Sequence, residues 1–150
     1  MAYPKTTKRT FLNVAEATRR TMAANSSTET KPEVNLRKAL WAAGLRGYRK
    51  NVRKLPGKPD IVFGPRKVAI FIDGCFWHAC PHCGRFVYPK KNADYWHEKI
   101  ESNKRRDVEV RAQLERQGYT VLTVWECEVK KHLQDCVIRV RQALGAQTQV

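Results

Sequence analysis

The chain has 150 residues and a formal net charge of +15 at pH 7, and its sequence isoelectric point is about 10.0. This length is typical of a single domain with a hydrophobic core, and no run of residues is long and apolar enough to span a membrane. So large a positive charge favours an anionic partner, with nucleic acid ahead of an acidic protein or a membrane surface.

The five cysteines bear on the cellular compartment and on metal binding. Their odd number, and the metal-like setting of three of them, favour a reducing cytoplasm and bound zinc over a secreted disulfide framework. The two others, Cys75 and Cys136, are expected to be small core residues. The basic N-terminus has no apolar signal core, so we expect a cytoplasmic protein.

Residues 1–30 form a basic segment that ends in a polar run. We expect either a DNA-contacting arm or a disordered, solubilising tail. A folded domain over 31–150 should follow. Its first helix is predicted to begin near Pro32 and Glu33, because proline favours the first helical turn, and to end at Gly44.

The remaining elements alternate between apolar strands and amphipathic helices. Two short apolar runs, 61–63 and 68–72, are separated by a turn and predict a hairpin whose second strand is central. A long helix is predicted over 93–117, a third strand over 119–125 and a last helix over about 130–144. This order indicates a mixed α/β sandwich.

Two aspartates mark the ends of the predicted hairpin. Asp60 opens the first strand directly after Pro59, and Asp73 follows the second strand beside it. A carboxylate fixed there can hold Mg²⁺, with Asp73 or the carbonyl oxygen of Ile72 sharing the ion. Such an ion activates water and neutralises charge on a scissile phosphate. The alternative is that Asp60 caps a turn.

A second group of residues has the spacing of zinc ligands. Cys80 and Cys83 form a C-x-x-C pair, with His82 between them as a competing ligand, and Cys127 follows the third strand. Asp107 lies on the apolar face of the long helix and needs a cation there. A structural zinc site of Cys80, Cys83, Asp107 and Cys127 is therefore predicted. The alternatives are a redox pair or free thiols, with Asp107 paired to an arginine.

Between the two groups lies a histidine that follows two aromatic residues. His78 can act as general base on an attacking water, although a zinc ligand or a core histidine is also compatible with its position. Phe76 and Trp77 are either core residues or a wedge that enters a DNA base stack.

The order and spacing of these motifs resemble the very short patch repair (Vsr) DNA mismatch endonucleases, over about residues 18–129. The motifs are Lys31-Pro32-Glu33, Leu55-Pro56-Gly57-Lys58-Pro59-Asp60, Phe71 to His78, Pro89 to Asn92, Tyr95-Trp96 with Lys99-Ile100, Asn103 to Asp107, and Val124 to Cys127.

The resemblance implies a restriction-endonuclease-like mixed sheet flanked by helices, with a structural zinc. It implies an enzyme that nicks one strand of double-stranded DNA, 5′ to the thymine of a T:G mismatch left by deamination of 5-methylcytosine. We expect a monomer in a bacterial cytoplasm, at the nucleoid while acting, with other mismatch-repair proteins as further partners. The alternatives are an endonuclease of the same fold with another specificity, and a non-catalytic, zinc-stabilised DNA-binding module.

Carried over by motif, Asp60 resembles the family's catalytic, Mg²⁺-binding aspartate, with the main-chain oxygen of Ile72 in the same shell. His78 resembles the general base, and Glu33 an acidic residue that supports the site. Asp73 stands where some members have a histidine proposed as the leaving-group acid, a role that in aspartate requires a raised pKa.

The resemblance also assigns DNA contacts. Phe76, Trp77 and Trp96 match the aromatic residues that enter DNA beside the mismatch, and Lys90 and Lys91 belong to a motif expected at the nucleic acid.

For zinc, the resemblance matches Cys80, Asp107 and Cys127. Many members carry Cys-Pro-x-His where this chain has Cys80-Pro81-His82-Cys83. Cys83 is expected as the fourth ligand, with His82 as the second choice.

Overall fold

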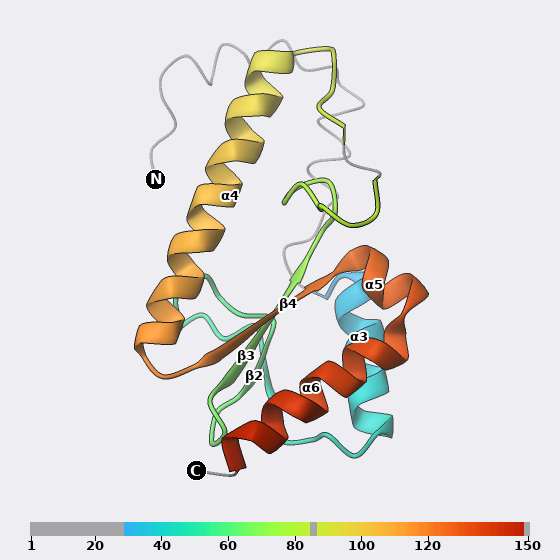
Figure 1. The fold of residues 1–150 in the computed structure, drawn as a ribbon, viewed down its shortest axis with the longest axis vertical. Helices are drawn as coiled ribbons and strands as arrows, with labels where there is room; N and C mark the ends of the chain where they lie inside the picture. Colours follow the sequence, from blue (N-terminus) through green and yellow to red (C-terminus); the bar gives the residue numbers. More distant parts are fainter. Residues whose placement is uncertain (1–28, 85–86, 149–150) are drawn as a thin grey trace.

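The computed structural model describes residues 29–84 and 87–148, with helices on both faces of a four-stranded mixed sheet (Figure 1). The predicted N-terminal arm lies almost wholly outside the described residues. Within the described residues, no helix has the length and apolar character needed to cross a lipid bilayer. The predicted α/β class and mixed sheet are confirmed.

The sheet has the strand order β1-β2-β3-β4. Strands β1 (Arg49–Lys50), β2 (Ile61–Phe63) and β3 (Val68–Asp73) pair antiparallel, and β4 (Thr120–Trp125) pairs parallel to β3. The hairpin and the central position of its second strand were predicted from continuous apolar runs, which suit strands that are covered on both faces. The two-residue strand β1 was not predicted.

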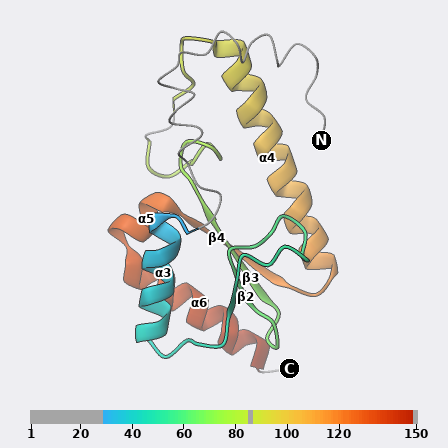
Figure 2. The same ribbon diagram turned by 180° about the vertical axis from the view of Figure 1, so that it is seen from behind.

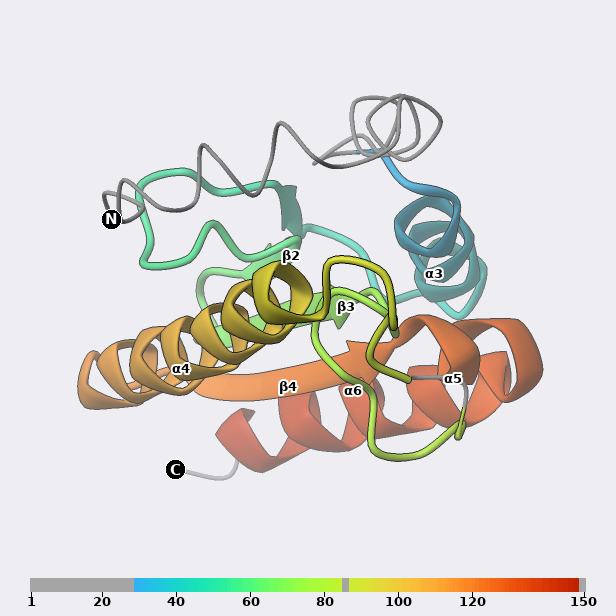
Figure 3. The ribbon, with the colours of Figure 1, turned by 90° about the horizontal axis from the view of Figure 1, so that it is seen from above.

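In the part of the chain that the structure describes, four helices surround this sheet: α3 (Lys31–Ala42), α4 (Ala93–Arg116), α5 (Glu126–Lys131) and α6 (Leu133–Thr148). Helices α3, α5 and α6 pack together over one face, whereas α4 covers the other, as the view from above shows (Figure 3). The first turns of α4 extend beyond the ends of the strands (Figure 2). Its upper part is therefore available for contacts outside the sheet.

Two apolar layers follow from the alternation of side chains along the strands. Toward α3, α5 and α6 the core contains Leu36, Leu40, Ile61, Phe63, Val68, Ile70, Val124, Val129, Cys136, Val137, Val140 and Leu144. Toward α4 it contains Val62, Ala69, Phe71 and Leu114. Cys136 lies in the layer toward α3, α5 and α6, as the sequence predicted.

The C-terminal part differs from the prediction of one helix over about 130–144. Helix α5 begins directly after β4, so Cys127 lies in a helical first turn. The reason is local, because Glu128 Oε1 accepts a hydrogen bond from the Trp125 N–H at 3.0 Å and so stabilises the helix start. His132 then separates α5 from α6.

The parallel pairing of β3 and β4 brings distant residues together. Asp73, the last residue of β3, pairs with Trp125, the last residue of β4. The segment that leaves β3 and the start of α5 therefore lie at the same edge of the sheet, where the predicted functional residues gather.

Candidate active site

A cavity of about 1010 Å³ opens at this edge, between α3, α4 and the end of β3. The residues around it include the four predicted catalytic residues, Glu33, Asp60, Asp73 and His78. Ile72 and Asp107, which were predicted as metal ligands, and Trp77, which was predicted to contact DNA, line it as well. Cationic side chains line it too, namely Lys31, Arg53, Lys58 and Arg106. Acidic groups inside a cationic rim are suited to bind the phosphates of a nucleic acid close to carboxylates.

Asp60 is held by the backbone of the neighbouring strand. Its Oδ2 accepts a hydrogen bond from the Ile72 N–H at 2.7 Å, and its own N–H donates to the Ile70 carbonyl at 3.0 Å. The pKa of Asp60 is raised to about 7, mainly by burial and also by Glu33 and Asp73, against the opposing effect of the Ile72 N–H. A bound cation would offset the cost of the negative charge on Asp60 beside these acids, so the carboxylates suit the predicted Mg²⁺.

Glu33 is fixed at the start of α3, with 3% of its surface exposed. Its Oε2 accepts a hydrogen bond from the Glu29 N–H at 3.2 Å, and its Oε1 accepts one from the Thr30 hydroxyl, also at 3.2 Å. Arg37 lies one helical turn further, with Nη1 at 3.7 Å from Glu33 Oε2. These contacts hold the buried carboxylate close to Asp60.

The turn that leads into Asp60 is packed against α4. Gly57 has φ +71°, and a Cβ placed there would lie 2.2 Å from Cγ1 of Val110. The next residue, Lys58, also has a positive φ of 53°, which is uncommon outside glycine. The approach to Pro59 and Asp60 is therefore tightly constrained by sterics.

His78 lies between two carboxylates. Its Nδ1 is 2.5 Å from Oδ2 of Asp107 and 3.9 Å from Oδ2 of Asp73. Burial alone would lower the pKa of His78, but the hydrogen bond to Asp107 and the charges of both aspartates outweigh it, so the pKa is raised. Because a carboxylate engages Nδ1, Nε2 is the nitrogen left for a reacting group.

Asp73 is 5% exposed. Burial raises the pKa of its carboxyl, while His78 and Arg111 lower it. Arg111 was not singled out in the sequence, where it is one of many basic residues, yet its Nη2 lies 2.7 Å from Asp73 Oδ2.

The predicted aromatic wedge forms one cluster next to the cavity. The ring of Phe76 lies 5.2 Å from that of Trp77 and 5.3 Å from that of Trp96, which is 5% exposed. The Nδ2 of Asn103 donates to the Trp77 carbonyl at 2.9 Å and ties this segment to α4. Tyr95 completes the cluster.

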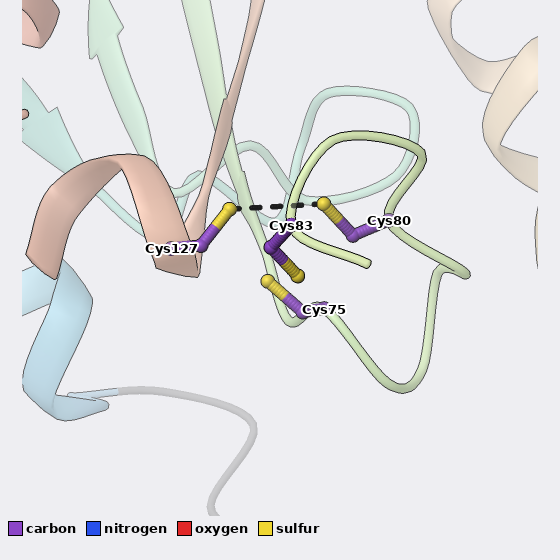
Figure 4. Close-up of side chains that lie close together, drawn as sticks. All are labelled: Cys75, Cys80, Cys83 and Cys127. Atoms are coloured by element: carbon purple, nitrogen blue, oxygen red, sulfur yellow. Dashed lines mark hydrogen bonds between the residues drawn. The ribbon is translucent and has the colours of Figure 1, made fainter. Parts of the chain in front are cut away.

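Four cysteines form a second group beside the cavity: Cys75, Cys80, Cys83 and Cys127 (Figure 4). Their sulfur atoms lie within 4.8 Å of one another, and those of Cys80 and Cys127 are 3.7 Å apart. Four thiolates around one Zn²⁺ would be about 3.8 Å apart, given Zn–S bonds of about 2.3 Å in tetrahedral geometry. The donor set therefore fits structural zinc, although burial raises the pKa values of the Cys75 and Cys127 thiols in the absence of an ion.

This group differs from the predicted zinc set in one residue. Cys75, expected to be a core residue, takes the place of Asp107, because the Cys80 N–H donates to the Cys75 carbonyl at 2.9 Å and folds the segment back. Asp107 instead belongs to the group of His78 and Asp73. Cys83 rather than the exposed His82 joins the cysteines. The spacing of Cys75 to Cys80 is the signal that sequence reasoning passed over.

The predicted DNA-contacting lysines, Lys90 and Lys91, are exposed immediately before α4. They are close in sequence to Tyr95 and Trp96 of the aromatic cluster. Neither lysine is among the described residues that line the cavity.

Comparison with known proteins gives the class of this site. A type II nicking enzyme of Neisseria meningitidis serogroup C is 46% identical over 129 residues, which are 86% of this chain and 86% of the relative. A type II nicking enzyme of Neisseria meningitidis serogroup A is 49% identical over 104 residues, covering 69% of this chain and 73% of the relative. Together with the carboxylates and histidine of the cavity, these relatives define an endonuclease.

The family is equally clear. A profile described as "DNA mismatch endonuclease Vsr" matches residues 13–85. DNA mismatch endonuclease Vsr of Escherichia coli strain K12 is 38% identical over 116 residues, which are 77% of this chain and 73% of the relative. The chain belongs to the Vsr family of DNA mismatch endonucleases, with DNA as its substrate.

Proposed function

We propose that this protein nicks one strand of double-stranded DNA on the 5′ side of the thymine in a T:G mismatch, and so begins repair of deaminated 5-methylcytosine. The observation that carries the proposal is the meeting of two groups in one cavity, the pair of the buried Glu33 and the partly buried Asp60, and the trio Asp73, His78 and Asp107. We further propose that the mixed sheet is of the restriction-endonuclease type.

The first group would hold a metal ion. Asp60 would bind Mg²⁺ together with the main-chain oxygen of Ile72, and Glu33 would add negative charge beside them. When bound, Mg²⁺ supplies Lewis-acid stabilisation of the charge that builds on the scissile phosphate. The raised pKa of Asp60 supports this assignment, because a buried carboxylate near other acids favours a cation over a proton once the cation is present.

The second group would activate water. With Nδ1 of His78 engaged by Asp107, Nε2 accepts a proton from the attacking water while the water oxygen bonds to phosphorus. The phosphorus–O3′ bond then breaks and the leaving O3′ oxygen takes a proton from solvent, which leaves a 5′-phosphate and a 3′-hydroxyl. Asp73 supports the histidine from its second side. In this proposal Asp107 orients the base, and zinc is held by Cys75, Cys80, Cys83 and Cys127.

The DNA contacts complete the proposal. Phe76, Trp77 and Trp96 would insert beside the mismatch, since aromatic wedges unstack base steps at a cost lowest where pairing is already weak. Lys90 and Lys91 would contact phosphates next to them. A monomer is sufficient, because a single-strand nick needs one active site.

The test is a nicking assay with purified protein, Mg²⁺ and a labelled duplex that contains one T:G mismatch, beside the fully paired T:A duplex of the same sequence. We expect a single nick 5′ to the mispaired thymine and none in the control. Equal cutting of both duplexes would contradict mismatch specificity, and cutting of neither in a panel of sequence contexts would contradict the proposed activity.

A further inference from the structure

We propose that Arg111 is a positioning residue for the reaction, which sets the orientation of His78 by holding the two aspartates that face it. This inference rests on the proposed function, because it takes His78 as the base. Among the described residues, no hydrogen bond or ion pair joins Arg111 to His78 itself. Arg111 acts through Asp73 and Asp107.

The guanidinium of Arg111 is held at each edge. Its Nε donates to Oγ1 of Thr123 on β4 at 2.8 Å, and its Nη1 donates to the Asp107 carbonyl at 3.3 Å. Its Cζ lies 4.6 Å from the ring centre of Phe71, so a strand side chain supports the flat face. A planar group fixed on three sides has little freedom to follow the groups that it binds.

This fixed guanidinium binds both acids. Its Nη2 lies 2.7 Å from Oδ2 of Asp73, and its Nη1 lies 3.8 Å from Oδ1 of Asp107. Two carboxylates facing one imidazole repel each other, and Asp73 is buried, so its charge is costly without a cation. Arg111 offsets that cost and holds the two aspartates in defined places.

The same oxygen of Asp73 that binds Arg111 also faces His78. Oδ2 is 2.7 Å from Arg111 Nη2 but 3.9 Å from His78 Nδ1, whereas Asp107 approaches Nδ1 to 2.5 Å. Arg111 therefore holds Asp73 beyond hydrogen-bonding distance and leaves Nδ1 to Asp107. Without the guanidinium, Asp73 is free to turn toward His78 and compete for the same nitrogen, which changes the plane of the ring.

The kinetic test compares Arg111→Met and Arg111→Lys with Arg116→Met, which removes the same charge from an exposed position of α4. For nicking of the T:G duplex we expect Arg111→Met to lower kcat at least about tenfold with KM changed less than about threefold. Arg111→Lys should recover part of the loss, because it keeps a charge but cannot bridge two acids and Thr123. Arg116→Met should keep the wild-type kcat. An Arg111→Met protein with wild-type kcat would overturn the proposal.

A double-mutant cycle separates positioning from a general loss of stability. If Arg111 acts by restraining the charge of Asp73, then Arg111→Met with Asp73→Asn should be at least about fivefold more active than Arg111→Met alone. Additive losses in the double variant would overturn the role through Asp73. Folded fractions are measured alongside by thermal unfolding, so that kcat refers to folded enzyme.

A second readout does not depend on activity. In the zinc-loaded protein, long-range ¹H–¹⁵N correlation spectra of the His78 imidazole should show one tautomer with Nδ1 as the hydrogen-bond donor, and a mixture in Arg111→Met. If wild-type protein fails to nick T:G DNA, the proposed function fails while these spectra still decide the role of Arg111. An unchanged His78 spectrum in Arg111→Met would overturn the inference.

Discussion

The carboxylate–histidine cavity and the four-cysteine group share one segment of chain but are held in different ways. The cavity is built on β-strands and α4, through hydrogen bonds, ion pairs and close packing that the chain makes by itself. The cysteine group joins residues 75–83, which form turns, to the first turn of α5, and a 3.7 Å sulfur contact joins Cys80 to Cys127. Such thiol contacts are weak on their own.

The two regions therefore depend on ions for different reasons. The residues of the cavity are held by contacts within the protein, so a cation there would serve the chemistry. The cysteines bring together a segment without helix or strand, so an ion there would serve the fold. Each prediction below tests one side of this comparison.

The largest effect is expected for Asp60→Ala. Nicking should fall by roughly 10³-fold, because the variant removes the carboxylate proposed to hold the cation. Affinity for a T:G duplex, measured by fluorescence anisotropy, and zinc content should match the wild type. Loss of zinc from this variant would show that the two regions are not independent.

The next effect separates the candidate zinc ligands. Cys75→Ser should lower bound zinc, measured by atomic emission, and cost more than about 3 kcal/mol of unfolding free energy, as expected for loss of a structural metal. Asp107→Asn should keep its zinc and lose nicking. Cys136→Ser is the control, since Cys136 is buried in the core toward α3, α5 and α6 and is not part of the four-cysteine group. Zinc lost from Asp107→Asn but kept in Cys75→Ser would restore the ligand set predicted from sequence.

Packing of the turn before Asp60 is tested by Gly57→Ala. The new Cβ would lie 2.2 Å from Cγ1 of Val110, whose short branched side chain cannot move out of the way. Gly57 also has a positive φ. The matched control is Gly44→Ala, with φ +81° and no atom within 4 Å. Both should lose about 1 kcal/mol from backbone strain, and Gly57→Ala about 1–3 kcal/mol more. Equal losses in chemical denaturation would contradict the tight fit.

The smallest effect is a pH dependence of the metal-free protein. The folded state keeps the proton of Asp60 up to about pH 7, whereas the ordinary pKa of an aspartate side chain is 3.8. The folded state therefore binds more protons between these values, and stability falls as pH rises through this window. Asp60→Asn should flatten that fall in urea titrations at pH 5 and pH 8. An equal fall of stability with pH in both proteins would show that a group other than Asp60 causes it.

Regular periodicity explains what the sequence predicted well. The face of the long helix that contains Trp96, Ile100, Asn103 and Leu114 is buried, because a 3.6-residue repeat fixes a face without knowledge of its partner. The hairpin followed from two short, continuously apolar runs, which suit strands that are covered on both faces.

Spacing alone could not decide between contacts made across the chain. Asp107 was expected to need a partner, and its charged partners are His78 and Arg111 rather than the cysteine group. Cys75 lies in an apolar context that is equally typical of a core residue. The positions of both depend on how residues 74–83 fold back, which no local pattern encodes. The catalytic and DNA-binding roles of the individual residues stay predictions.

Helix α4 also fixes the spacing of two residues of the site. Trp96 and Asp107 are eleven residues apart on one continuous helix, a fixed separation of about 16 Å along its axis. The distance between Trp96 and Asp107, the partner of His78, is thus set by helical rise rather than by a loop. Inserting one residue between Asn103 and Asp107 would turn the two halves by about 100° relative to each other. Length in this segment is therefore under a stricter constraint than the identity of its exposed residues.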